Sequence, residues 1–392
     1  MGRRKLCRTR YKVWAWVSGF IKECYFGRMI NNEISNMKIV HILNSLKGGG
    51  IQNFLLSLAP EQVIKGCQVL IIVVDNDDYE YCIRLKEKFE NNGVRVCYLN
   101  KKLHSKISFL KTLIKCRNII KKEQPDIVNT HGEICHIYGA VATWGRKIKH
   151  CITVHNAPEH WNKLNILFNG SKPLIFCSEA AYSLRVQKNK SYEVINNGIS
   201  PSIVQTKECV NLRDELNLSH NDKIVVSVGS LRPQKNYDFL KEISTAMMDE
   251  HIHFCVCGGN YGKGYINTNS FKEYKNIHFL GLRSDISAIE NTANLFLSCA
   301  TFEGLPIAVL EAYFNGIPCV LSPIEQHINI SNVSKCWIPE SFKVSDFIVA
   351  IKEALRCEDS HNIIYAERLP FIEIYSISRT AELYIKYYNN LL

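Results

Sequence analysis

The chain has 392 residues, a hydrophobic fraction of 46% and a formal net charge of +11. This length exceeds what one core usually organises, so two domains are expected, and a charged fraction of only 22% argues against long disordered tracts. Most of the 16 cysteines stand singly inside apolar runs, which is typical of reduced thiols in a cytosolic protein and argues against a zinc site.

Residues 1–36 form a basic N-terminal extension with eight Lys or Arg residues and two Glu residues. Its apolar stretch, residues 13–21, is too short to span a bilayer, and no signal-peptide cleavage site follows it. Two interpretations stay open: an interfacial anchor, or translated sequence upstream of the true start. The second is slightly preferred, because Met37 opens directly onto an apolar strand. The rest of the chain is mildly basic, which favours a membrane surface or a phosphorylated substrate over nucleic acid.

From Met37 onward, strands and helices alternate. A strand over 38–43, a glycine-rich turn at 48–50 and a helix over 51–59 lead into a strand over 69–74, which is a βαβ unit. The following elements are expected as a helix over 79–91, a strand over 94–99, a helix over 107–122 and strands over 127–130, 151–155 and 174–177. Continuous apolar strands of this kind belong to a parallel sheet covered on both faces.

The helix over 107–122 has apolar residues at helical spacing, and this stripe is predicted to pack on the sheet. The stripe consists of Ile107, Leu110, Leu113, Ile114 and Ile120. Its basic opposite face would suit anionic lipid. His131, after the next strand, is interpreted either as a core or capping histidine or as an acceptor-side residue.

A second alternating set follows Asn197-Gly198 and a polar stretch. It predicts strands over 224–228, 253–256, 277–280, 295–298 and 319–321, with helices over 237–248 and 306–314. The fold class is therefore α/β, with two Rossmann-like doubly wound domains over 37–198 and 199–370. Their facing strand ends would form a deep cleft, where such sheets bind ligands. Residues 371–392 are expected to form a C-terminal helix that packs back on the first domain.

The loop and helix that follow the strand over 295–298 predict an anion site. Pro306 suits the first position of the helix over 306–314, and Gly316 suits the position that ends this helix. The backbone N–H groups of Gly304, Leu305 and Ile307, together with the helix dipole, would bind a pyrophosphate.

Two carboxylates, Glu303 and Glu311, flank this anion site. Because a carboxylate cannot itself bind phosphate, these side chains are expected to bind sugar or ribose hydroxyls. The alternative is that Glu303 is a solvated loop residue and Glu311 a helix-surface residue.

The loop over 229–236 is a second strand-to-helix turn, and its Arg232 and Lys235 would neutralise the same diphosphate as a sugar leaves. Lys235 as a solvent-facing turn residue is the alternative there.

In their order and spacing, these motifs resemble the donor half of glycosyltransferase family 4, the group 1 type, which is a retaining GT-B family. The motifs are Gly229 to Lys235, Gly258-Gly259, Phe279-Leu280-Gly281, Glu303-Gly304 through Glu311-Ala312, and Gly316-Ile317-Pro318. Weaker matches over 37–198 extend the resemblance to essentially the whole chain after Met37.

The resemblance implies a role for each matched position of the second domain. Glu311 would bind the ribose, Glu303 the transferred sugar near its anomeric centre, and Lys235 the diphosphate. Arg283 would lie near the base. Two positions depart from the family: Ser230 stands where many members have Arg, a charge that Arg232 would supply instead, and Ala300 stands where members often have Ser.

The resemblance also implies roles in the first domain and a reaction. His155 would reach across the cleft to the sugar or the acceptor, and the turn with Gly49 and Gly50 would leave room for the donor phosphates or the acceptor. The expected activity is metal-independent, retaining transfer of a hexose-type sugar from a nucleotide-diphosphate sugar, by front-face displacement and with no further cofactor. The expected acceptor is a glycan, lipid-linked, in O-antigen, capsule or similar cell-surface polysaccharide synthesis.

The reduced cysteines and basic surfaces predict a cytoplasmic protein, peripheral on the cytoplasmic face of the inner membrane, and the absence of nucleic-acid-binding motifs predicts no nucleic-acid partner. Two alternatives stay open, a sugar-nucleotide epimerase of the same fold and a non-catalytic glycan-binding subunit. Asp75-Asn76-Asp77 superficially matches a metal-binding Asp-x-Asp motif, but a turn or helix cap explains it better. The glycine-rich segment 258–264 fits neither the Walker nor the dinucleotide spacing, and it is interpreted as a turn.

Overall fold

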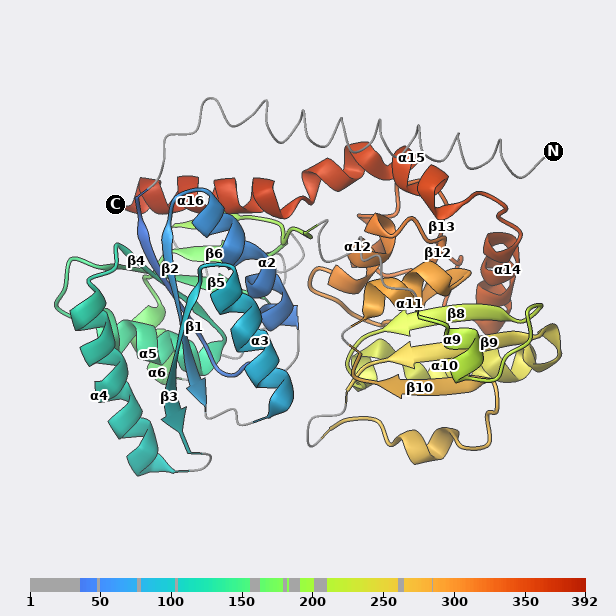
Figure 1. Ribbon diagram of the computed structural model, residues 1–392, viewed down its shortest axis with the longest axis horizontal. Coiled ribbons are helices and arrows are strands. Elements are labelled where there is room, and N and C mark those ends of the chain that lie inside the picture. The colour runs from blue at the N-terminus through green and yellow to red at the C-terminus, as the bar shows by residue number, and fades with distance from the viewer. Residues whose placement is uncertain are drawn as a thin grey trace.

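The computed structural model describes residues 36–47, 50–75, 79–102, 105–155, 163–178, 182, 191–200, 210–259, 264–283 and 285–392. Two parallel sheets with helices on their faces lie side by side along the long axis of the molecule (Figure 1). The predicted α/β class with two Rossmann-like domains is confirmed. The predictions for residues 1–35 and for Gly49 lie outside the described residues.

The first domain is built on a parallel sheet whose described strands are ordered β3-β2-β1-β4-β5-β6-β7. These strands are β1 (Lys38–Leu43), β2 (Gln68–Asp75), β3 (Arg95–Lys101), β4 (Ile127–His131), β5 (Lys149–Val154), β6 (Leu174–Phe176) and β7 (Tyr192–Val194). The helices are α2 (Gly50–Ile64), α3 (Glu80–Asn91), α4 (Lys106–Glu123), α5 (Glu133–Thr143) and α6 (Lys163–Asn169). The central strands are buried along almost their whole length, which explains their continuous apolar sequences.

The second domain repeats the plan, with described strands ordered β10-β9-β8-β11-β12-β13. The strands are β8 (Lys223–Val228), β9 (Ile252–Cys257), β10 (Ile277–Gly281), β11 (Leu295–Ser298), β12 (Cys319–Leu321) and β13 (Cys336–Trp337). The α-helices are α9 (Leu212–Glu215), α10 (Tyr237–Ala246), α11 (Ile286–Thr292), α12 (Ile307–Phe314), α13 (Glu325–Ile328), α14 (Val344–Leu355) and α15 (His361–Ile374), and the chain ends with a further helix, α16 (Ile377–Leu391). The 3-10 turns are η2 (Pro233–Lys235), η3 (Met248–Glu250) and η4 (Thr268–Phe271).

In each sheet the strand order reverses once. The reversal lies between β1 and β4 in the first sheet and between β8 and β11 in the second. Loops that leave the carboxyl ends of such neighbouring strands diverge to opposite faces, which opens a crevice for a ligand. The loops after β8 and β11 are the two loops that the sequence predicts to bind a diphosphate.

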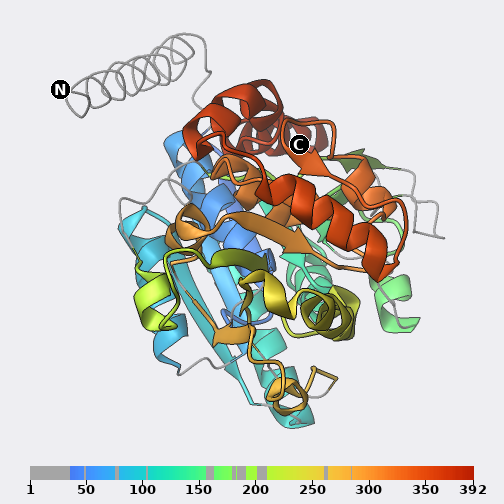
Figure 2. The ribbon, with the colours of Figure 1, turned by 90° about the vertical axis from the view of Figure 1, so that its right-hand side faces the viewer.

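The chain crosses between the domains twice, and the two crossings lie side by side. Ile199 and Ser376 form an isolated parallel bridge, the N–H of Ile199 donates to the oxygen of Tyr375 over 2.8 Å, and the N–H of Ile377 donates to the oxygen of Ile199 over 3.0 Å. After the second crossing, α16 packs on α2, and its buried side chains join the first core (Figure 1, Figure 2). The last helix therefore belongs to the first domain by packing, although it follows the second in sequence.

Several predicted elements change their bounds. The helix expected over 51–59 continues to Ile64 through Pro60, because Glu61 and Gln62 are buried beyond it. Helix α5 stands where no helix was predicted, and α12 begins at Ile307 with Pro306 as its cap. Gly316 ends that helix with a φ of +66°, a conformation that favours glycine.

The prediction for the face of α4 is wrong for three residues. Ile107, Leu110 and Ile114 are 69%, 61% and 63% exposed, whereas Cys116 and Ile120 are buried. The reason is tertiary, because α4 packs against α5 as well as against the sheet. The hydroxyls of Thr112 and Tyr138 hydrogen-bond over 2.6 Å at this contact, which turns the exposed stripe toward solvent.

Candidate functional site

The two domains touch where strands of each sheet end. Gly304, beyond β11, lies so close to His155, beyond β5, that a Cβ atom on Gly304 would be 2.8 Å from the carbonyl oxygen of His155. The hydroxyl of Ser178, beyond β6, donates to the carbonyl oxygen of Gly304 over 3.4 Å. His155 and the Glu303-Gly304 loop therefore lie next to each other across the domain boundary.

An ion pair joins the two loops at the strand reversal of the second sheet. Lys235 Nζ lies 2.5 Å from Glu303 Oε1, and the two side chains are 17% and 9% exposed. The backbone N–H of Thr301 donates to the carbonyl oxygen of Gln234 over 2.9 Å, which fixes one loop against the other. The pair is nearly enclosed, so each charge depends on the other for compensation.

Two glycines make room for this arrangement. A Cβ on Gly229 would lie 2.8 Å from Cε of Lys235, so the stem of that lysine passes directly over the glycine. A Cβ on Gly258 would lie 1.8 Å from the carbonyl oxygen of Gly229. The buried Tyr237 hydroxyl donates to the same oxygen over 3.1 Å. The glycines at 229 and 258 therefore serve close packing of backbone and lysine.

Glu311 lies in α12, and burial raises the pKa of its carboxyl to about 7. Glu290 of α11 is fully buried, and its pKa is raised well above its ordinary value, first by burial and then by the charge of Glu311. Asn315 donates to Glu290, and the hydroxyl of Ser287 donates to Asn315 Oδ1 over 2.8 Å. Sequence reasoning missed Glu290, because a glutamate in a short helix has the pattern of a solvated surface residue.

The expected anion site at the start of α12 is changed in one respect. The N–H of Ile307 donates to the oxygen of Leu305 over 2.9 Å, so it is not available to a ligand as predicted. Pro306, with a φ of −78° and a ψ of 79°, forms an inverse γ-turn, and this turn closes the hydrogen bond. Within the described residues, the N–H groups of Gly304 and Leu305 have no hydrogen bond.

The structure gives the two predicted arginines other partners. The Arg232 guanidinium lies over the ring of Tyr265, 5.5 Å from its centroid, and donates to its hydroxyl over 3.3 Å. Arg283 donates to both oxygens of Asp285 over 2.8 Å and to Glu215 over 2.9 Å. These carboxylates already balance the charge of Arg283. Gly50, the first residue of α2, is exposed.

The histidines of the first domain form a group that the sequence did not predict. His131 Nδ1 lies 2.8 Å from His155 Nε2, and His131 Nε2 lies 2.9 Å from His41 Nδ1. His131 is therefore a core histidine that contacts His155 at the domain boundary. The alternation of residues on β1 and β4 is the signal that places His41 and His131 on one face of the sheet, but it requires the strand register to be known.

Other predicted features lie apart from this site. Asp75 accepts hydrogen bonds from Lys101 over 2.7 Å and from Asn44 over 2.9 Å, while Asn76 and Asp77 lie outside the described residues. Across the described ranges, no three His, Cys, Asp or Glu side chains are grouped as metal ligands. Cys255 and Cys257 are buried free thiols of β9.

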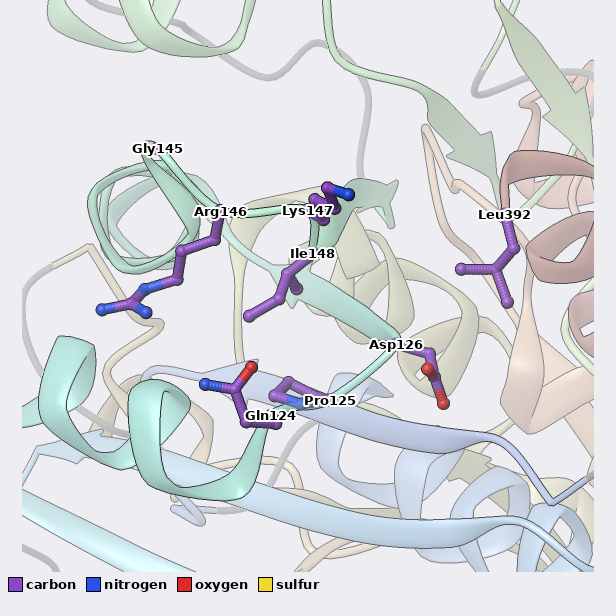
Figure 3. A pocket seen from close by; sticks show the side chains of 8 residues that line it. All are labelled: Gln124, Pro125, Asp126, Gly145, Arg146, Lys147, Ile148 and Leu392. Carbon is purple, nitrogen blue, oxygen red and sulfur yellow. The ribbon is translucent and has the colours of Figure 1, made fainter.

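A shallow hollow of about 440 Å³ lies at the amino ends of β4 and β5 (Figure 3). Its lining comes from the segments before these strands and from the last residue, Leu392. Because ligands of doubly wound sheets bind at the carboxyl ends of the strands, this hollow is on the wrong edge of the sheet for the candidate site.

Two family models match the chain. Residues 48–203 match the model described as Glycosyltransferase Family 4, and residues 210–369 match the model described as Glycosyl transferases group 1. The two matches meet near the first crossing between the domains and together include most of the chain.

The relatives include glycosyltransferases of capsular polysaccharide and O-antigen biosynthesis. The chain is 26% identical over 266 residues to the UDP-Gal:alpha-D-GlcNAc-diphosphoundecaprenol alpha-1,3-galactosyltransferase of Escherichia coli. The aligned region covers 61% of this chain and 66% of that protein. It is 22% identical over 373 residues to the O-antigen biosynthesis glycosyltransferase WclY of Escherichia coli, and this alignment covers 91% of this chain and 99% of that protein.

The crystal structure of Anabaena HepE in complex with UDP and glucose has the same fold. It superimposes with a TM-score of 0.72 at 17% sequence identity and covers 89% of this chain and 98% of that one. The two-domain arrangement is therefore that of the GT-B glycosyltransferases.

Proposed function

Because this chain belongs to the group 1 glycosyltransferases of family 4, we propose that it transfers a hexose-type sugar, with retention of configuration, from a nucleotide-diphosphate sugar to a lipid-linked glycan. The galactosyltransferase relative is named for such a donor and for a diphosphoundecaprenol-linked acceptor, and HepE was solved with UDP and glucose. The product belongs to O-antigen, capsule or a similar cell-surface polysaccharide.

The observation that carries this proposal is the Lys235–Glu303 pair beside His155. Breaking a sugar–phosphate bond leaves negative charge on the diphosphate and positive charge on the anomeric carbon. A lysine and a glutamate held 2.5 Å apart supply the complementary charges side by side. When a donor binds, Lys235 exchanges its carboxylate partner for the diphosphate, and Glu303 becomes available to the sugar.

The reaction then needs one bond exchange and one proton transfer. The bond from the anomeric carbon to the leaving phosphate oxygen breaks, and the acceptor hydroxyl oxygen bonds to the same face of that carbon. The hydroxyl proton passes to the leaving diphosphate. Glu311 orients the donor through its ribose, and His155 contacts the sugar or the acceptor from the first domain.

Donor binding is tested by saturation-transfer NMR with a panel of UDP-, GDP- and other nucleotide sugars. We expect one donor class to bind, and Lys235→Ala and Glu311→Ala to weaken it about tenfold or more, because each removes a charged contact. Lys241→Ala is the matched control, since Lys241 pairs with Asp238 on the surface of α10. A protein that binds none of these nucleotide sugars would refute the donor site.

Turnover separates the proposal from its alternatives. Incubation with the donor alone converts it if the protein is an epimerase, whereas a transferase needs a diphospholipid-linked acceptor. We also propose that the reaction needs neither a metal ion nor a further cofactor. Transfer that persists unchanged in EDTA supports this proposal, and loss of transfer that Mg²⁺ or Mn²⁺ restores contradicts it.

The surface of α4 supports peripheral membrane contact on the cytoplasmic face. Ile107, Leu110 and Ile114 form an exposed apolar stripe among exposed lysines of α4. Helix α4 lies on the side of the first domain that is farther from the second (Figure 1). Among the described helices, none has the length and hydropathy to cross a bilayer. We expect sedimentation with phosphatidylglycerol vesicles, but not with phosphatidylcholine vesicles, and loss of sedimentation when the three residues become Ser. Ile363→Ser, on the exposed face of α15, is the control.

A further inference from the structure

Three buried histidines form a continuous hydrogen-bonded row that ends at the candidate site. The row runs from Gln62 Oε1 to His41 Nε2 over 2.9 Å, from His41 Nδ1 to His131 Nε2 over 2.9 Å, and from His131 Nδ1 to His155 Nε2 over 2.8 Å. The exposed fractions of the three histidines are 0%, 1% and 8% along this path. The row therefore begins in the core and ends at the domain boundary.

The strand register builds this row. His41 on β1 is level with Asn129 on β4, and His131, two residues further along β4, is level with Thr153 on β5. His155 lies two residues beyond Thr153. Side chains two residues apart on a strand share a face of the sheet. From His41 to His131, and from His131 to His155, the row therefore passes to the neighbouring strand and moves two residues further along it, on the same face. The row is thus a diagonal that climbs toward the carboxyl edge of the sheet.

Helix α2 covers this diagonal from end to end. Its Gln62 contacts the inner histidine, and its Phe54 packs edge-on against His155 with ring centroids 5.4 Å apart. Eight residues separate the two, which corresponds to about 12 Å along a helix. Desolvation lowers the pKa of His41 to about 4, and burial followed by the neighbouring histidines lowers the pKa of His131 well below its ordinary value. The inner rings are therefore neutral at pH 7.

The nitrogen–nitrogen contacts of this row allow only two proton arrangements. His41 and His131 each carry one N–H, and each contact needs one proton, so the tautomer of His41 dictates that of His131 and decides whether Nε2 of His155 carries a proton. Gln62 turns its oxygen toward His41, so His41 must donate from Nε2. His131 then donates from Nε2 to His41, and His155 donates from Nε2 to His131.

We propose that Gln62, His41 and His131 are positioning residues that fix His155 in its Nε2–H tautomer. The ring of His155 is thereby held in one orientation beside the Glu303-Gly304 loop. The catalytic use of this orientation rests on the proposed function, whereas the tautomer itself does not. A ring that is already oriented contacts the sugar or the acceptor without first having to rotate.

The tautomers are measured by long-range ¹H–¹⁵N correlation NMR on the full protein with ¹⁵N-labelled histidine at pH 7. We expect neutral Nε2–H rings at positions 41 and 131, and a proton on Nε2 of His155. Gln62→Met retains the length of the side chain and removes the amide oxygen, so we expect mixed tautomers along the row. In a transfer assay, we expect kcat to fall about tenfold with the donor KM within about twofold, as for the loss of an orienting partner of a histidine.

Thr112→Val is the matched control, because it also removes a buried hydrogen bond of the first domain but lies away from the row. An Nδ1–H tautomer at His155 in the wild-type protein overturns the inference, and so do unchanged tautomers in Gln62→Met. The NMR measurement needs no substrate. If the wild-type protein shows the expected tautomers but turns over no donor, the positioning is supported and only the proposed function fails.

Discussion

Lys235 and Glu303 carry opposite charges that depend on each other in this protein. Both side chains lie in a nearly enclosed place, so their ion pair replaces the water that each charge loses there. The two residues are 68 positions apart in the sequence. Each was predicted to contact a different part of the donor, and the structure adds that they first contact each other.

The stability of the protein tests this pairing. Lys235→Met leaves the carboxylate of Glu303 with no counter-charge, so we expect the free energy of unfolding to fall by about 2 kcal/mol. The double variant Lys235→Met/Glu303→Gln removes both charges and should regain most of this loss. Urea denaturation of the three proteins measures it. A double variant that is less stable than Lys235→Met would show that the pair does not carry this role.

Glu311 makes the stability depend on pH. Its pKa is raised from 4.5 to about 7, so the folded state retains a proton that the unfolded state has lost between these values. Folding stability therefore falls as the pH rises from 4.5 to 7, by at most about 3 kcal/mol. We expect Glu311→Gln to be the more stable protein at pH 8 and to match the wild type near pH 4.5.

Thermal unfolding between pH 4.5 and pH 8 measures this dependence. The exposed Glu353→Gln on α14 is the control, and it should follow the wild-type curve. Parallel curves for Glu311→Gln and the wild type would contradict the assignment.

Among the secondary-structure elements, α15 contributes a buried arginine that hydrogen-bonds the edge of the second sheet. Arg368 donates to the carbonyl oxygens of Ser334, Ile317 and Lys335 over 2.9, 2.9 and 3.1 Å, and its guanidinium lies 4.7 Å from the ring centroid of Tyr313. These carbonyls belong to the loops that enter β12 and β13. Arg368 thus joins three segments that are separate in the sequence.

Replacement of this arginine removes its hydrogen bonds to these three carbonyl oxygens. The oxygens of Lys335 and Ile317 retain the N–H of Cys319 over 3.0 Å and the thiol of Cys319 over 3.2 Å. We expect Arg368→Met to lower the free energy of unfolding by about 3 kcal/mol, and Arg368→Lys to recover only part of it, because an ammonium group lacks the planar fork. Chemical denaturation compares both with Arg356→Met, an exposed control on the surface after α14. Equal stability of Arg368→Met and Arg356→Met would show that these contacts contribute nothing.

Local sequence patterns predicted most elements, and their ends and contacts were harder to predict. The apolar strands and the two strand-to-helix loops of the second domain follow from short contiguous patterns, so they were found. The exposed stripe of α4 was not predicted correctly. From the sequence alone, Ile107 and Leu110 fit a buried face equally well, and only the position of α5 shows that they are exposed. Helix α16 completes the first core through Tyr384 and Tyr388, and the hydroxyl of Tyr388 accepts from Asn129, 259 residues earlier.

For the whole molecule, the close contact between Gly304 and His155 sets how near the two domains come. We expect Gly304→Ala to retain the backbone N–H but to push the domains apart locally, because its Cβ would be 2.8 Å from the carbonyl oxygen of His155. The transfer kcat should fall about tenfold with a smaller change in the donor KM, since the donor contacts of the second domain remain.

Steady-state kinetics on Gly304→Ala measures this effect, and thermal unfolding checks that the protein is folded. An unchanged kcat would show that the contact does not determine how His155 meets the donor side of the cleft.

The sequence by itself determined the α/β class, the two-domain plan and the family, because periodicity and contiguous motifs are local properties of the chain. Only the tertiary structure decided that Lys235 pairs with Glu303, that Glu290 lies behind Glu311, and that three histidines form one row. These features depend on strand register and on which loops meet at the strand reversal. Such relations join residues from 21 to 90 positions apart, and no local pattern contains them.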